Sequence, residues 1–283
     1  MALHGSVILP TVNRLLDLLA GRDPAVPLDR AALELATIEF PELEIDVFLA
    51  LLDSYAYELQ GRLNGSENGA DYVREANRYL FDELGFSGNA PDYYNPRNSC
   101  LNEVLTARVG IPITLSLVYI EIGRRLGKPV RGIGLPGHFI VSYDDGLYCT
   151  YIDPFHRGRQ LEQEQCFEVA REASGLVLEP DPELLRPVEN RQILLRMINN
   201  LHRAYLSRGY IGKAIEVIDL LIRVNPGSAS EYRHRGALHV QNGNMTAARA
   251  DLARYLQLAP EAADHDEVKE QLTKVQRWLA SLN

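Results

Sequence analysis

The sequence predicts an α+β core placed between two all-α regions, in a chain of 283 residues. Before about residue 90, apolar residues recur at helical spacing. Between residues 98 and 153, two helical patterns are followed by short alternating stretches typical of antiparallel strands. After residue 194 the chain repeats with a period of 34 residues. We expect four parts, which are a helical N-terminal subdomain (1–90), the core (91–160), a connector (161–193) and helical repeats (194–283).

The composition excludes several classes of protein. It is 46% hydrophobic and 24% charged, as in ordinary soluble domains. A net charge of −9 disfavours general binding to nucleic acid or to an anionic membrane. The first residues lack the basic and apolar regions of a signal peptide, and no apolar run is long enough to span a bilayer. Because the three cysteines match no zinc or disulfide framework, we expect a cytoplasmic protein that binds neither nucleic acid nor membrane.

The N-terminal region is predicted to be a small helical subdomain. Helical spacing of apolar residues marks four segments, at about 7–20, 30–39, 45–63 and 71–84. The polar stretch 64–69 is a clear break between the last two. No reactive side chains are grouped here, so we expect a structural role.

The core begins with two predicted helices. The first covers about 98–108, where Asn98 or Ser99 is a good N-cap. The second starts near Pro112 and is apolar nearly all round, so it should be buried in the centre of the domain. Strands are predicted at about 130–134, 138–143 and 147–153.

The C-terminal region carries the repeat. Residues 34 apart match in type at six places, namely Gly209/Gly243, Ala214/Ala248, Ile218/Leu252, Leu221/Tyr255, Val224/Leu258 and Pro226/Pro260. This period is typical of tetratricopeptide units, in which two helices pack and a proline closes the unit. A last helix, at about 266–282, is expected to cap the stack.

The candidate site lies on the second and third predicted strands. If they pair as a hairpin with Tyr143 opposite Tyr148, His138 lies opposite Asp153. Facing side chains have Cβ atoms about 5 Å apart, which suits a carboxylate that orients an imidazole. Cys100 is the plausible upstream nucleophile, and with it these residues would make a Cys-His-Asp site.

Other residues offer weaker alternatives. Thr114 and Ser116 carry hydroxyls but nothing else marks them, Cys149 lies too far along its strand to reach His138, and Cys166 is expected to be structural. The polar and aromatic segment 92–98 is expected to cap the sheet as a loop or to line the mouth of a cleft. Together with His156, His138 and Asp153 have metal-ligating atoms, but no helix-borne metal spacing is present. We therefore expect no metal and no cofactor.

Five segments of the core resemble the SirB-one family, as does the order of helical N-terminus, core and repeats. The segments are Tyr94–Leu105, Arg108–Ser116, Leu126–Val130, Pro136–Phe139 and Ile152–Phe155. The resemblance implies a transglutaminase-like or papain-like fold, in which a helix packs on an antiparallel sheet. Members of that family are mostly described as uncharacterised or regulatory.

The resemblance also implies where a catalytic site would lie. An active transglutaminase-like protein places its cysteine at the start of the central helix, where the helix dipole and an imidazolium lower the thiol pKa. His138 and Asp153 match the positions of the other two catalytic residues. Here the central helix starts at Pro112-Ile113-Thr114, so the sequence departs from the pattern at the nucleophile.

Two functions remain open from the sequence. The favoured one is a non-catalytic regulatory factor that binds a protein or peptide through its repeats or its core. The alternative is a thiol enzyme, an amide hydrolase or acyl transferase, with Cys100 as nucleophile, His138 as base and Asp153 as orienter.

Overall fold

The computed structural model describes residues 13–23 and 26–282, which form two compact units divided after Asn199. Residues 7–12 of the first predicted helix and the N-terminal segment tested for a signal peptide lie outside the described residues. The four-part division of the chain stays a prediction.

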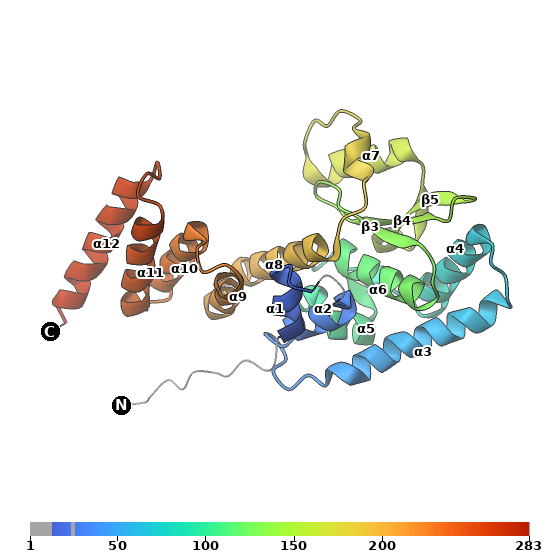
Figure 1. The fold of residues 1–283 in the computed structure, drawn as a ribbon, viewed down its shortest axis with the longest axis horizontal. Helices are drawn as coiled ribbons and strands as arrows, with labels where there is room; N and C mark the ends of the chain where they lie inside the picture. The colour runs from blue at the N-terminus through green and yellow to red at the C-terminus, as the bar shows by residue number, and fades with distance from the viewer. Residues whose placement is uncertain (1–12, 24–25, 283) are drawn as a thin grey trace. The chain divides into compact units, whose positions relative to one another are not determined.

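The first unit begins with helices that match the predicted N-terminal subdomain (Figure 1). They are α1 (Asn13–Leu19), α2 (Leu28–Ala36), α3 (Ile45–Leu63) and α4 (Gly69–Asn77), which continues into the π-helical segment η1 (Arg78–Glu83). Asn68 caps α4, because its side chain accepts hydrogen bonds from the backbone N–H groups of Ala70 and Asp71.

Three helical elements and two small sheets then form the α+β core. The helical elements are η2 (Pro96–Ser99), α5 (Leu101–Ala107) and α6 (Pro112–Arg125). A short parallel pair joins β1 (Ser87–Gly88) to β2 (Val109–Gly110). An antiparallel sheet follows in the order β3 (Val130–Ile133), β4 (Ile140–Asp144), β5 (Cys149–Asp153) and β6 (Arg159–Leu161).

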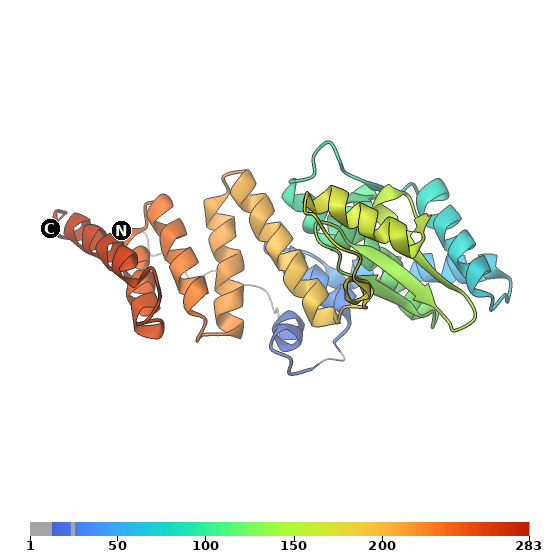
Figure 2. The same cartoon turned by 90° about the horizontal axis from the view of Figure 1, so that it is seen from above.

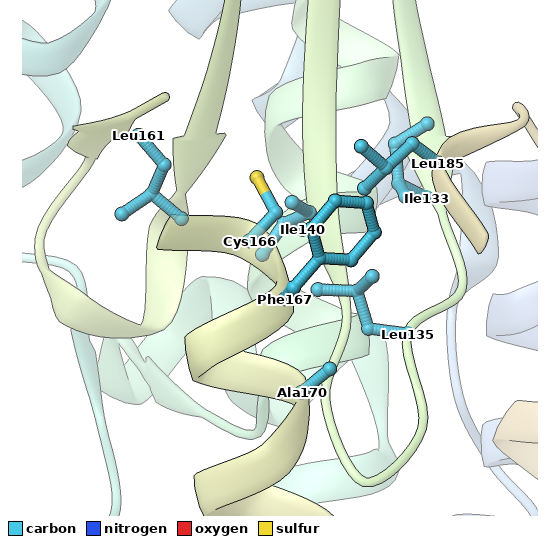
Figure 3. Close-up of a cluster of buried hydrophobic side chains, with 8 residues drawn as sticks. All are labelled: Ile133, Leu135, Ile140, Leu161, Cys166, Phe167, Ala170 and Leu185. Carbon is cyan, nitrogen blue, oxygen red and sulfur yellow. The ribbon is translucent and has the colours of Figure 1, made fainter. Parts of the chain in front are cut away.

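Helices cover both faces of the antiparallel sheet. Helix α6 contacts β3 and β4, and α7 (Gln163–Ser174) lies on the opposite side (Figure 1). Figure 3 shows the cluster of buried side chains that joins α7 to the sheet, with Cys166 and Phe167 of α7 against Ile140 of β4. Because both faces are covered, residues 140–143 of β4 are all buried instead of alternating.

The structure corrects the predicted strand register. Tyr143 pairs with Thr150, not with Tyr148, and Val141 pairs with Ile152. The hairpin loop begins at Asp145, whose side chain accepts hydrogen bonds from the N–H groups of Leu147 and Tyr148. Since the partner of each residue moves by two positions, every side chain keeps its predicted face. Strand β4 also begins at Ile140, so His138 lies in the turn that precedes it.

The predicted connector contains regular structure. Besides α7 it holds the 3₁₀ helix η4 (Pro182–Leu185). Helix α7 escaped prediction because only Cys166, Phe167 and Ala170 are buried on it, a stripe too short to stand out among its charged residues.

The second unit consists of antiparallel helices that follow the predicted repeat (Figure 2). The helices are α8 (Asn190–Ser207), which begins in the first unit, then α9 (Ile211–Val224), α10 (Ala229–Gln241), α11 (Met245–Leu258) and α12 (His265–Ala280). The bounds of α9 and α11 differ by the 34-residue period of the sequence. Ala248, Leu252 and Tyr255 of α11 form a buried cluster with Val268 and Val275 of α12, which therefore packs on the last repeat as predicted.

Candidate functional site

His138 and Asp153 contact each other directly, although not by the predicted pairing. The Nε2 atom of His138 lies 2.9 Å from Oδ2 of Asp153, and both residues are buried. Asp153 ends β5, and its side chain caps the 3₁₀ helix η3 (Pro154–His156). A residue diagonal to the facing position is still within reach of a long side chain, which explains why the contact survives the change of register.

Asp153 also holds a second imidazole. Nδ1 of His156 lies 2.7 Å from the same Oδ2 atom, while Oδ1 accepts hydrogen bonds from the N–H groups of Phe155 and His156. Burial disfavours the charged carboxyl, but the hydrogen bonds and electrostatic attraction of the two histidines outweigh it, so the pKa of Asp153 is lowered from its ordinary value. The carboxyl is therefore ionised at neutral pH.

The carboxylate determines which tautomer each imidazole adopts in its neutral form. An ionised carboxylate can only accept hydrogen bonds, so Nε2 of His138 and Nδ1 of His156 carry the protons. The opposite nitrogen of His138, Nδ1, then bears the lone pair. That is the state of an imidazole prepared to act as a base beside an orienting carboxylate.

Backbone and aromatic contacts hold His138 in place. It follows Gly137, which has a left-handed φ of 71°, and its carbonyl accepts a hydrogen bond of 2.6 Å from Nη2 of Arg196 on α8. The ring of Phe155 lies edge-on to both His138 and His156, with centroids 5.9 and 5.2 Å apart. The ring of Tyr93 also lies edge-on to Phe155, with centroids 6.2 Å apart, so part of the predicted polar and aromatic segment lies beside the site.

The position and burial of Cys100 differ from those of an activated catalytic cysteine. It is the residue immediately before α5, not the start of the central helix α6, and it is fully buried. Its Sγ atom lies 3.6 Å from the carbonyl oxygen of Pro96. Burial raises the pKa of Cys100 well above its ordinary value, so the thiol stays protonated at neutral pH. The catalytic role of Cys100 stays a prediction.

The hydroxyls of the two alternative nucleophiles, Thr114 and Ser116, make hydrogen bonds to the backbone. The Thr114 hydroxyl is buried, donates to the carbonyl of Asn98 at 2.8 Å and accepts from the N–H of Ile111. Ser116 is buried and donates to the carbonyl of Phe139, which brings α6 against the residue that follows His138. Cys149 is exposed at the start of β5, whereas burial raises the pKa of Cys166 to about 12 in the cluster beneath α7.

Sequence reasoning missed the role of two residues. His156 was considered only as a metal ligand, yet its position three residues after Asp153 and the intervening Pro154 are a local signal for the hydrogen bond observed. Arg196 lies 58 residues from His138 in the sequence, within a helix assigned to the repeats, and no local pattern connects the two.

A helix packed on an antiparallel sheet, with a His-Asp pair beside it, defines a transglutaminase-like core, and the sequence comparisons agree. A family model described as the transglutaminase-like superfamily matches residues 46–199, and a tetratricopeptide repeat model matches residues 201–273. The chain belongs to the transglutaminase-like superfamily. The predicted order of this core followed by tetratricopeptide repeats is thus confirmed.

Relatives occur in bacteria and in animals. The chain is 37% identical to a UPF0162 protein of Xylella fastidiosa over 252 residues, which cover 87% of this chain and 89% of that protein. A UPF0162 protein of Pseudomonas aeruginosa is 29% identical over 262 residues, covering 93% of each. F-box only protein 21 of Mus musculus is 34% identical over 134 residues, which are 44% of this chain and 20% of that protein.

Among the described residues, no helix is long and apolar enough to cross a bilayer.

Proposed function

We propose that this protein is a non-catalytic regulatory factor that binds a protein or peptide partner. The observation that carries the proposal is the complete burial of Cys100 immediately before α5, which keeps its thiol protonated. A transglutaminase-like reaction needs a thiolate, and a buried neutral thiol cannot supply one. In this proposal the His138–Asp153 pair organises the core instead of activating a nucleophile.

The repeats supply the docking surface in this proposal. Tetratricopeptide stacks commonly present an extended helical surface to peptides. On α10, Ala237 and Val240 are exposed and three residues apart, so they share one helix face. An exposed apolar pair of this kind suits contact with an apolar side chain of a partner.

The His138–Asp153 geometry favours a second candidate function, that of a thiol enzyme. The pair has the tautomer of a catalytic base, with a lone pair on Nδ1. For this function Cys100 would have to become exposed and lose its proton when substrate binds.

Affinity capture followed by mass spectrometry tests the favoured proposal. The intact chain is compared with the variant Ala237→Glu/Val240→Glu, with Cys100→Ser, and with Gln276→Glu on the exposed face of α12 as the matched control. We expect partners captured by the wild type and by Gln276→Glu to be reduced about tenfold or more with the double variant. They should remain with Cys100→Ser. Equal capture by the double variant and the wild type would contradict docking on this face, and loss of capture with Cys100→Ser would favour the enzyme.

A further inference from the structure

We propose that His138, Asp153 and His156 form a binding site for one divalent transition-metal ion of the Zn²⁺ type. The three side chains each offer one ligand atom, and these atoms all lie within 4.8 Å of one another. The expectation that no metal binds rested on the absence of helix-borne spacing. In the structure the three ligand atoms are brought together by the end of β5, the η3 turn and the turn before β4.

The ligand set determines the class of ion. Two imidazole nitrogens and one carboxylate oxygen are typical of Zn²⁺ and of neighbouring first-row ions such as Co²⁺. Ca²⁺ and Mg²⁺ prefer sets made wholly of oxygen ligands, so they fit this site poorly. His138 and Asp153 are buried, whereas the side chain of His156 is 57% exposed, so the ion can enter from solvent on the His156 side. A water molecule can complete a four-coordinate shell from the same side.

The surroundings hold the ligands in place, as metal sites require. Two backbone N–H groups bind Oδ1 of Asp153, which leaves Oδ2 directed at the two imidazoles. Arg196 clamps the carbonyl of His138, and the Phe155 ring packs against both imidazoles. The three ligand groups therefore need little reorganisation.

Binding an ion would change the spacing of all three ligand atoms. The ligand nitrogens of the two imidazoles, which lie within 4.8 Å of each other, would have to come to the spacing of a metal site. Ligand atoms around a tetrahedral Zn²⁺ lie about 3.4 Å apart, given bonds of about 2.1 Å. The contacts from Oδ2 to His138 and His156, 2.9 and 2.7 Å, would each have to open by roughly half an ångström. As a ligand, each imidazole would carry its proton on the other ring nitrogen and present a lone pair to the ion.

Metal titration of the untagged full chain tests this site. Cys149 is an exposed thiol that could bind Co²⁺ or Zn²⁺ by itself, so the titrations use the Cys149→Ser background. Co²⁺ is followed by its visible absorption and Zn²⁺ by calorimetry. We expect one ion per chain, and we expect His156→Ala to weaken its binding by about 100-fold or more.

Two control variants make the result decisive. His265→Ala removes a histidine near an aspartate on α12 and should leave the affinity unchanged. Asp153→Asn should abolish tight binding, and circular dichroism without metal should show that His156→Ala keeps the wild-type fold. Stoichiometric Co²⁺ binding that His156→Ala removes and His265→Ala retains supports the site. Equal affinities in the wild type and His156→Ala, or no binding by the wild type, would overturn it.

Discussion

At the residue scale, Asp153 shows how a buried charge is stabilised in this core. Its carboxylate accepts hydrogen bonds from two imidazoles and two backbone N–H groups, so its acceptor positions are satisfied without bulk water. Cys100 is the opposite case. It is buried with one weak contact to a carbonyl oxygen, and such a contact would not stabilise the negative charge of a thiolate.

The difference between Cys100 and Cys149 predicts their reactivity. In native protein between about pH 6 and 9, iodoacetamide should alkylate Cys149 at least roughly 100 times faster than Cys100, because the Cys149 thiol is exposed and the Cys100 thiol is buried and protonated. Peptide mapping by mass spectrometry gives the two rates. In denaturant both thiols should react alike, which controls for local sequence effects. Rapid alkylation of native Cys100 that is lost in His138→Ala would instead identify an activated thiol and favour the enzyme.

The chemical types at the site could be predicted from the sequence, but their detailed contacts could not. Placing His138 and Asp153 on two consecutive predicted strands was enough to predict that they meet, although His138 lies in the turn before β4. The second imidazole was predictable in principle, since His156 follows Asp153 within one turn. The clamp on His138 by Arg196 depends on how α8 packs, and packing between distant segments leaves no local pattern.

At the element scale, the hairpin shows which part of a strand pairing a sequence determines. Successive side chains of a strand point to opposite faces because its period is two, so a register error of two positions leaves every face unchanged. The register depends on the loop, and here the side chain of Asp145 binds two backbone N–H groups and sets where the loop starts. The predicted register therefore placed each residue on the correct face but two positions from its true partner.

Helix α7 makes the turn before β4 sensitive to a single methyl group. Gly137 has a φ of 71°, and a Cβ atom there would lie 2.6 Å from the backbone carbonyl group of Ala173 on α7. Gly146, in the hairpin loop, has a similar φ of 82°, but a Cβ atom there would meet nothing within 4 Å. The two glycines therefore share the same backbone strain and differ in steric contact.

We expect Gly137→Ala to lower the free energy of unfolding by about 3 kcal/mol, since strain and a backbone clash add together. Gly146→Ala is the matched control and should cost about 1 kcal/mol, the strain alone. Urea denaturation followed by circular dichroism measures both. Equal losses in the two variants would show that α7 does not pack against Gly137 in solution.

At the scale of the whole molecule, the repeats and the first unit differ in how much of their structure the sequence predicts. The repeat unit is built from contacts close in sequence, so a 34-residue period predicted its helices and their turns, where Gly209 and Gly243 both have positive φ. The first unit depends on contacts between distant segments. One of these contacts is a charged network in which Arg125 on α6 binds Asp29 on α2 at 2.6 Å and Asp53 on α3 at 2.6 Å. No local pattern in the sequence pairs these residues, because each alone is typical of a solvated helix face.

Glu121 gives this network a pH dependence that the stability of the first unit should follow. Glu121 is 1% exposed and binds Arg124 and Arg125, yet burial and the charge of Asp29 raise its pKa to about 7. A carboxyl whose pKa is higher in the folded state than in the unfolded state favours folding while it is protonated. Its contribution is therefore complete below about pH 4.5 and is lost as the pH rises through about 7, a loss of roughly 3 kcal/mol at most.

In Glu121→Gln this loss should vanish, so the free energy of unfolding of this variant should fall less than that of the wild type between these pH values. The exposed Glu164→Gln should keep the wild-type slope. Urea denaturation across this range measures the slopes, and hydrogen exchange of α2 and α6 locates the effect. Parallel slopes for Glu121→Gln and the wild type would show that folding does not shift the pKa of Glu121.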